Sequence, residues 1–430
     1  MMPAGAALGY DATPPISAPL RYFLTAPFFG MLAGLLLLIS PDVLVSRWTP
    51  GALALTHLAT LGFMVMVMVG ALFQILPVVC GAAIPMAGRI ALAVHLLLVG
   101  GTVALATGLY KMSPPILTVA AALLGMALSV FLLSAMIGLS KVGSGTGSQR
   151  DVRLALIGLG VAALLGLSLA LTRAQGLPLP MFSMLQLHLG WALLGGAGLL
   201  LAATSWIVVP MFQITPSYPR AMIRFWALSC TGALTLWSIS VLLEWKILSL
   251  ILLGLIVALT ALFLFTTLVV IGKTRRSHPD ASYRLFRLGI WSLIAGLVCL
   301  LSTLVSDAPM LRILAGVLII YGGFVSVIEA MLYKIVPFLA WLHLTQSGIK
   351  APNVRQLQPE DGTRNQLRIH TVALVILLMA VLLGNDWLTR LAGAAIVIEF
   401  GWLFFNMHGV LSAYRKTRTD SPARRYSSAA

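Results

Sequence analysis

The sequence predicts an all-α polytopic membrane protein with about twelve transmembrane helices arranged as three four-helix repeats. Of its 430 residues, 60% are apolar and 9% are charged, and the mean hydropathy is +1.00. A soluble fold of this length keeps a large polar exterior, so the bilayer must serve as the solvent. Long apolar runs recur along the whole chain, and one five-residue motif occurs three times.

The apolar runs define the expected helices. They lie near 21–40, 52–77, 90–110, 115–140, 152–173, 183–209, 222–243, 247–271, 285–306, 310–336, 369–385 and 388–411. At about 1.5 Å per residue, each is long enough to cross roughly 30 Å of hydrocarbon. The first run follows polar, proline-rich residues and continues as a spanning helix, so no cleaved signal peptide is expected. The chain is predicted to be a single transmembrane domain with a flexible loop at 344–368 and a flexible tail at 416–430.

The basic residues predict the orientation of the helices. If both termini are cytoplasmic, 22 of the 28 lysines and arginines lie on the cytoplasmic side. The other side holds six, which are Arg47, Lys111, Arg173, Lys246, Arg312 and Arg390. This asymmetry is the positive-inside pattern. The net charge of +16 is therefore explained by topology, and we expect a bacterial inner-membrane protein with lipid and no nucleic acid as partner.

The repeated motif ends three of the expected helices. Its copies are Phe73–Pro77, Phe212–Pro216 and Tyr333–Pro337, whose prolines are 139 and 121 residues apart. A second alignment pairs Pro77, Pro210 and Pro337 at spacings of 133 and 127, and the sequence does not choose between the two. Either alignment gives repeats at approximately 18–142, 150–272 and 284–412.

These prolines are expected to end their helices at the cytoplasmic face, because proline has no amide hydrogen and clashes with the preceding turn. Gln74, Gln213 and Lys334 occupy the same place in the three copies. We expect them to bond the free carbonyls at the helix ends.

Two of the marked helices carry a histidine near the opposite end. His57 precedes Pro77 by 20 residues and His188 precedes Pro210 by 22, so both lie at a similar depth. Two facing imidazoles could hold a haem iron or a copper ion. Thr56, Ser183 and Gln186 are candidates to orient them. The alternative is that each histidine only forms hydrogen bonds within the bundle.

The helix around His57 also carries a more detailed pattern. It combines His57 with Gly62, Phe63, Gly70, Pro77 and Gly81. This pattern resembles the second helix of the NnrS family, membrane proteins that bind haem and copper and are linked to bacterial nitric oxide metabolism. More distantly it is similar to subunit I of the haem-copper oxidases and nitric oxide reductases, which has twelve helices in three arcs of four.

The resemblance implies that His57 ligates haem, but it does not imply an oxidase. The oxidases carry a histidine pair on helix 7 and two haem-ligating histidines on helix 10. Here the runs 222–243 and 310–336 contain no histidine. The three cysteines form no CxxCH motif, which argues against a covalently attached c-type haem.

Two intramembrane carboxylates are the strongest polar anomalies. Glu329 and Glu399 lie within apolar runs, where insertion of a charged residue costs roughly 2.5–3.5 kcal/mol. We predict that they face a cavity or a proton path, to which Tyr333, Lys334, His95 and His408 could contribute. Alternatively, Glu329 pairs with Lys334 or with a neighbouring helix. His278, His343 and His370 lie in or beside the expected loops and are interpreted as solvated.

Three hypotheses about function follow. The first is a haem- or copper-binding inner-membrane protein of respiratory or nitric-oxide-related metabolism, without a complete oxidase site and with an unidentified electron-transfer partner. The second is a transporter that uses the intramembrane carboxylates. The third is an assembly or scaffold protein that keeps the fold without a metal. The sequence assigns no catalytic residue.

Overall fold

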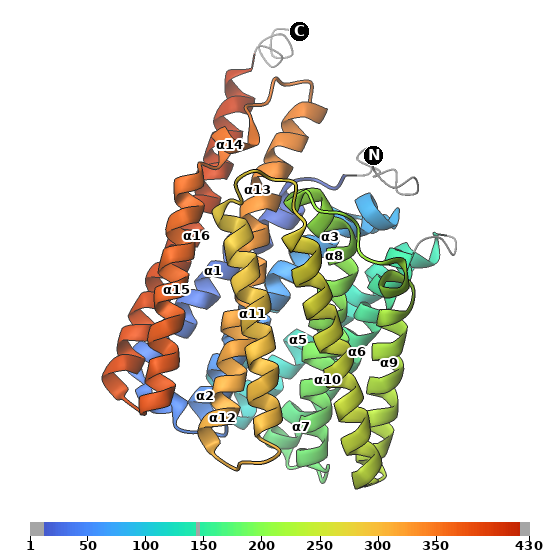
Figure 1. Ribbon diagram of the computed structural model, residues 1–430, viewed down its shortest axis with the longest axis vertical. Coiled ribbons are helices and arrows are strands. Elements are labelled where there is room, and N and C mark those ends of the chain that lie inside the picture. Colours follow the sequence, from blue (N-terminus) through green and yellow to red (C-terminus); the bar gives the residue numbers. More distant parts are fainter. Residues whose placement is uncertain (1–12, 143–146, 422–430) are drawn as a thin grey trace. The chain divides into compact units, whose positions relative to one another are not determined.

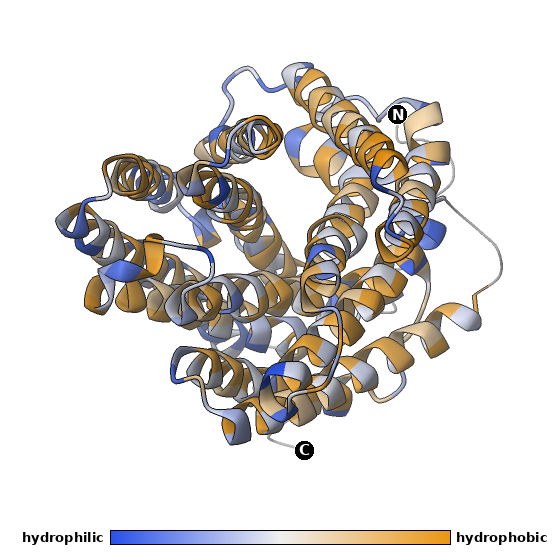
Figure 2. Ribbon diagram, turned by 90° about the horizontal axis from the view of Figure 1, so that it is seen from below, coloured by the Kyte–Doolittle hydropathy of each residue, from blue (hydrophilic) through white to orange (hydrophobic). Residues whose placement is uncertain are grey.

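The computed structural model describes residues 13–142 and 147–421 (Figure 1). These residues contain helices and no strand. Twelve of the described helices are long and apolar enough to cross a membrane, which confirms the all-α polytopic fold. Hydrophilic residues gather in the connections, while apolar residues dominate the helices (Figure 2). Large apolar side chains such as Leu164, Ile398 and Phe405 are exposed, as expected for helices surrounded by lipid.

Nine of the spans are single helices. They are α1 (Ser17–Ile39), α4 (Ala87–Tyr110), α5 (Pro114–Ser140), α6 (Gly147–Gln175), α9 (Arg220–Leu242), α10 (Lys246–Gly272), α11 (Ala281–Ser302), α15 (Glu360–Leu383) and α16 (Asp386–Asp420). Several begin at residues suited to a helix start. The Asp280 carboxylate accepts a hydrogen bond from Tyr283 N, and the Asn385 side chain accepts one from Leu388 N.

The other three spans each contain a π-helix. They are α2–η3–α3 (Pro50–His57, Leu58–Val65 and Met66–Cys80), α7–η4–α8 (Met181–Gly190, Trp191–Gly198 and Leu199–Gln213) and α12–η5–α13 (Pro309–Gly316, Val317–Val325 and Ser326–Gln346). These are the three spans that carry the repeated motif. Long π-helices are rare and often mark functional positions.

The π-helices favour one of the two motif alignments. They end at Val65, Gly198 and Val325, and in each span a proline follows 12 residues later, since 77 − 65, 210 − 198 and 337 − 325 all equal 12. The equivalent prolines are therefore Pro77, Pro210 and Pro337, at spacings of 133 and 127. This regularity supports the threefold repeat, which remains a prediction.

The expectation that these prolines end their helices is wrong. Pro77, Pro210 and Pro337 lie inside α3, α8 and α13, which continue to Cys80, Gln213 and Gln346. A spanning helix tolerates a proline where surrounding groups satisfy the backbone that it frees. Pro216 lies in the connection between α8 and α9.

The loop predicted at 344–368 is shorter in the structure. α13 extends to Gln346, and α15 already begins at Glu360. Between them lie the short helix α14 (Val354–Leu357), capped by Asn353, and a few connecting residues. Likewise α16 extends to Asp420, so the first residues of the predicted tail are helical, and residues 422–430 lie outside the described part.

The chain forms two compact units, one made of Met1–Pro15 and Ala71–Ser277 and the other of Ile16–Gly70 and His278–Ala430. In the first unit, α4 packs on α5, α5 on α6, and α6 on η4. Its core includes Leu187, Trp191, Leu234 and Trp237. In the second unit, α1 packs on α16 and η3, and α11 packs on η5.

Glycines allow helix backbones to approach closely in both units. In the first unit, a Cβ on Gly158 of α6 would overlap the backbone of Gly195 in η4. In the second, a Cβ on Gly289 of α11 would lie 3.0 Å from the Gly323 carbonyl oxygen in η5. Small residues let membrane helices pack at short range. The π-helix of each of these spans is thus held against the helix that precedes it.

Candidate functional site

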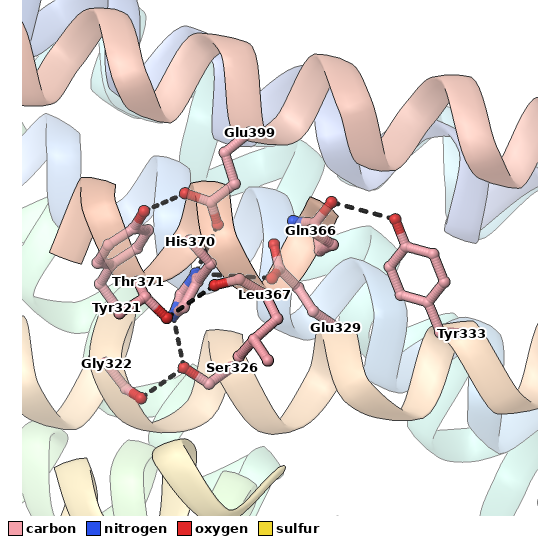
Figure 3. A network of polar contacts seen from close by, with 10 residues as sticks. All are labelled: Tyr321, Gly322, Ser326, Glu329, Tyr333, Gln366, Leu367, His370, Thr371 and Glu399. Carbon is pink, nitrogen blue, oxygen red and sulfur yellow. Dashed lines mark hydrogen bonds and ion pairs between the residues drawn. The ribbon is translucent and has the colours of Figure 1, made fainter. Parts of the chain in front are cut away.

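Three titratable side chains meet inside the second unit. Glu329 comes from α13, His370 from α15 and Glu399 from α16, and all three are fully buried (Figure 3). One ligand atom of each lies within 4.8 Å of the others. We call this group the carboxylate–histidine cluster. It lies within spans that are otherwise strongly apolar.

His370 is held by hydrogen bonds at both ring nitrogens. Its Nδ1 lies 2.6 Å from Glu399 Oε1, and its Nε2 lies 2.6 Å from Ser326 Oγ. The Ser326 hydroxyl donates to the Gly322 carbonyl oxygen at 2.6 Å. Because a hydroxyl has one hydrogen, Ser326 accepts from His370, and Nε2 carries a proton. The hydrogen bond between Nδ1 and Glu399 then requires a further proton, on the ring or on the carboxylate, because an unprotonated Nδ1 and an ionised carboxylate both only accept.

Glu399 has a second partner on the π-helix. The Tyr321 hydroxyl, in η5, donates a hydrogen bond to Glu399 Oε2. The Tyr321 ring also packs against the His370 ring, with centroids 4.9 Å apart. The widened turns of η5 thus present Tyr321 to the carboxylate and imidazole that Ser326 helps to position.

Glu329 has no comparable partner. Its Oε2 lies 3.6 Å from His370 Nδ1, which is longer than a hydrogen bond. Within the described residues, neither of its oxygens forms a hydrogen bond of ordinary length. Nearby, the Tyr333 hydroxyl donates to Gln366 Oε1 at 3.1 Å, which leaves the Gln366 amide nitrogen without a partner in the described chain. A buried carboxylate in this situation needs a compensating cation or proton.

One member of the cluster, Glu329, and several of its neighbours lie in a single motif-bearing span. In the alignment on Pro77, Pro210 and Pro337, the positions of Tyr321, Ser326, Glu329 and Tyr333 are Leu194, Leu199, Ala202 and Trp206 in the second copy. In the first copy they are Leu61, Met66, Val69 and Phe73. Polar side chains therefore replace apolar ones in the third copy alone. This difference is typical of a functional site added to a structural frame.

The structure brings Glu329 and Glu399 together in one cluster, and the expectation that they line a cavity or a proton path stays a prediction. His370 was missed, and its interpretation as a solvated residue is wrong because it is fully buried in α15. The residues that precede His370 in α15 are polar, and the apolar residues follow it. Hydropathy alone therefore places His370 at the edge of a loop. His343 is half-buried within α13 rather than solvated, while His278 is exposed.

Of the other residues of the predicted proton path, only Tyr333 is seen to contact a neighbour of the cluster within the described residues. Lys334 forms an ion pair with Asp280 at the start of α11, so the alternative pairing of Glu329 with Lys334 is wrong. Tyr333 reaches the cluster's neighbour Gln366. His408 is exposed on α16, where its ring packs near Phe404. His95, on α4, belongs to the other unit.

The predicted ligands His57 and His188 each use Nδ1 for a backbone contact. His57 Nδ1 lies 2.8 Å from the Leu53 carbonyl oxygen, and His188 Nδ1 lies 2.9 Å from that of Ala162. A carbonyl only accepts, so both Nδ1 atoms carry hydrogen and the lone pair lies on Nε2. These backbone carbonyls orient the two rings, and the roles expected for Thr56, Ser183 and Gln186 stay predictions. His57 belongs to the second unit and His188 to the first.

The motif glutamines do not act as expected. Both polar side-chain atoms of Gln213, and Oε1 of Gln74, lack hydrogen bonds to the described residues. Side chains from other segments of the same unit donate hydrogen bonds to the carbonyls at these helix ends. Thr274 Oγ1 donates to Gln213 O, Arg276 Nη2 to Phe212 O, and Gln149 Nε2 to Cys80 O. Donors at the start of α6 and in the connection between α10 and α11 therefore satisfy these carbonyls.

Comparison with known protein families finds no family model that matches this chain, and comparison with curated proteins finds no match.

Proposed function

We propose that this protein is a metal-binding membrane protein and that the carboxylate–histidine cluster holds one divalent transition-metal ion. The observation that carries the proposal is Glu329, a fully buried carboxylate that lies beside His370 and Glu399 and forms no hydrogen bond of ordinary length to the described residues. A buried polar group without a partner requires an explanation, and an ion is one of the few available.

The charges of the cluster fit such an ion. Two ionised carboxylates and one neutral imidazole carry a net charge of −2, which a single divalent cation neutralises. Carboxylate oxygen and imidazole nitrogen together suit first-row metals such as Mn²⁺, Fe²⁺, Cu²⁺ and Zn²⁺. When bound, the ion would supply Lewis acidity and, for a redox-active metal, one-electron chemistry.

The surrounding residues would orient the ligands. His370 Nε2 is held by Ser326, so Nδ1 faces the carboxylates. Tyr321 fixes one oxygen of Glu399 and leaves the other beside His370. Hydrogen bonds of this kind set the tautomer and direction of metal ligands. Only Glu329 and the Glu399–His370 contact need to adjust for the three donors to share one ion.

The test is metal analysis of the detergent-purified protein after chelation and reloading with Zn²⁺, Mn²⁺ or Co²⁺. We expect one ion per chain and, for Co²⁺, visible absorption bands from nitrogen and oxygen ligands. Glu329→Gln and Glu399→Gln should each abolish the bound ion. Glu360→Gln is the matched control, because Glu360 is an exposed residue at the start of α15, the helix of His370.

If the wild-type protein binds no metal after reloading, and Glu329→Gln does not differ from it, the proposal is rejected. Two protons shared within the cluster would then neutralise its charge. A separate assay, uptake of radioactive Zn²⁺ into proteoliposomes, distinguishes a resident ion from a transported one. Uptake that depends on Glu329 would favour the transporter hypothesis.

A second proposal follows from the helix 2 pattern and its resemblance to the NnrS family. His57 and His188 would ligate haem or copper through Nε2 in respiratory or nitric-oxide-related metabolism. The supporting observation is that both rings bind a backbone carbonyl through Nδ1, as metal-ligating histidines commonly do. Spectra of the oxidised and reduced protein should show a Soret band that weakens in His57→Ala. A colourless protein would contradict haem binding without affecting the first proposal.

We further propose a bacterial inner-membrane location with both termini in the cytoplasm. The support is the division of basic residues, with 22 of 28 on the cytoplasmic side of the twelve-helix topology.

A further inference from the structure

A cavity of about 160 Å³ lies within the second unit, apart from the carboxylate–histidine cluster's own donor atoms. Its walls come from α1, the span α2–η3–α3, the span α12–η5–α13, α15 and α16. Most lining side chains are apolar, including Leu37, Phe63, Leu377 and Phe400. The volume is close to that of the ~150 Å³ protein cavities that bind benzene-sized molecules.

Two arginines line one end of this cavity. Arg47 precedes α2, and Arg312 lies in the first turn of α12. Burial and the nearby Arg312 guanidinium lower the pKa of Arg47. Two neighbouring cations repel each other, and an anion between them would relieve that repulsion.

The charges of these arginines are poorly compensated by the described protein. Arg312 forms an ion pair with Asp307 at 3.4 Å. Because Asp307 is fully exposed, this ion pair is weak. Arg47 forms no ion pair with any described residue, and its buried Nε has no hydrogen-bond partner there. A guanidinium prefers planar anions such as carboxylate and phosphate, which it binds through paired hydrogen bonds.

Tyr321 also lines the cavity, farther along the same span than Arg312. It lies nine residues after Arg312 in the same span, which corresponds to about 13 Å along a helix. Tyr321 is the donor to Glu399, so a molecule that fills the cavity would reach the cluster's neighbour. The site therefore offers a cationic end, apolar walls and one phenol.

We propose that this cavity binds an amphipathic anion, with a carboxylate or phosphate head group between Arg47 and Arg312 and an apolar body directed toward Tyr321. The head group could belong to a free acid or to an acidic membrane lipid, which share this chemistry. The inference does not depend on a metal in the cluster.

The test uses equilibrium binding of radiolabelled decanoate to the full-length protein in a nonionic detergent. We expect saturable binding of one decanoate per chain, and competition by decyl phosphate but not by decanol or decyltrimethylammonium. Arg47→Gln and Arg312→Gln should each weaken binding by roughly tenfold, because each removes a charge-assisted hydrogen bond. Arg173→Gln, which removes an exposed arginine of the other unit, should leave binding unchanged.

A glycine variant tests the cavity itself. Gly316 lines the cavity, and a Cβ placed there meets no atom within 4 Å. Gly316→Leu should fill the space and abolish decanoate binding while the protein stays folded. Gly254→Leu is the matched control, since Gly254 also has open space around its Cα but lies on α10.

Mass spectrometry of extracted lipid distinguishes the two sources. An acidic lipid that copurifies with the wild type and is lost in Arg47→Gln supports a lipid ligand. Saturable decanoate binding without copurified lipid supports a free acid. Decanol binding as tightly as decanoate, or decanoate binding unaffected by both Arg47→Gln and Gly316→Leu, would overturn the proposal.

Discussion

Buried acidic residues in this molecule differ in how completely their charges are compensated. Asp151, in α6, receives two hydrogen bonds from Arg150 at 2.9 and 2.7 Å and one from Trp206 Nε1 at 3.0 Å. Glu329 receives none of ordinary length from the described residues. The first arrangement is that of a structural carboxylate, and the second is consistent with the metal site that we propose.

Asp151→Ala should destabilise the protein by about 1–3 kcal/mol, because it leaves the buried Trp206 indole without its acceptor and removes the ion pair with Arg150. The loss would appear as a lower melting temperature of the detergent-purified protein. Asp307→Asn is the control, since Asp307 is fully exposed and its ion pair with Arg312 should contribute little. Equal melting temperatures for Asp151→Ala and the wild type would refute a structural role.

Ser326→Ala should lower metal affinity by about 10- to 100-fold, because it removes the hydrogen bond that holds the His370 tautomer. Competition with a chelator of known affinity measures this change. Ser168→Ala is a suitable control, as this exposed hydroxyl also bonds a carbonyl one turn earlier, that of Leu164. If Ser326→Ala binds metal as tightly as the wild type, His370 is not a ligand positioned by Ser326.

At the scale of elements, the π-helices η4 and η5 each pack against a glycine of the preceding spanning helix. The contact of Gly158 with Gly195 and that of Gly289 with Gly323 leave no room for a side chain. Packing, rather than intrinsic propensity, therefore stabilises these wide turns, because π-helices are rare in isolation.

Gly158→Ala should destabilise the first unit by about 3 kcal/mol or more, since a methyl group would overlap the Gly195 backbone. The measurement is the fraction of monodisperse protein after heating in detergent. Gly232→Ala, in α9, has no atom within 4 Å of the added Cβ and should be neutral or slightly stabilising. A stable Gly158→Ala variant would show that α6 and η4 can separate without loss of the fold.

The existence of the twelve spans could be predicted because length and hydropathy depend on local sequence. The course of the helices past Pro77, Pro210 and Pro337 could not. A lone proline signals a helix end, and only the surrounding fold shows that the freed backbone is tolerated.

The site was predictable in part for a similar reason. Glu329 and Glu399 stand out in apolar runs, so hydropathy identifies them. His370 follows the polar segment that opens α15, where a histidine is no anomaly. Its role becomes visible only when α13, α15 and α16 bring the three side chains together.

For the whole molecule, the distribution of basic residues makes a topological prediction. Lys111 lies between α4 and α5, and Lys273 between α10 and α11, and both are exposed. In a background in which Cys80, Cys230 and Cys299 are replaced by alanine, Lys111→Cys should react with an impermeant thiol reagent added to intact cells. Lys273→Cys should react only after the membrane is permeabilised. If Lys273→Cys reacts in intact cells and Lys111→Cys reacts only after permeabilisation, the protein has the opposite orientation.

The contact between α1 and α16 has a consequence for biosynthesis. These helices approach so closely that a Cβ on Gly34 would lie 2.7 Å from the Gly393 carbonyl oxygen. During translation α1 enters the membrane before α16 has been made. Its contact with η3 can form early, but its face toward α16 stays uncovered until nearly all of the described chain has been made, whereas Ala71–Ser277 is continuous and can assemble as it emerges. A nascent chain that stalls before α16 would expose the packing face of α1 to membrane quality-control proteases.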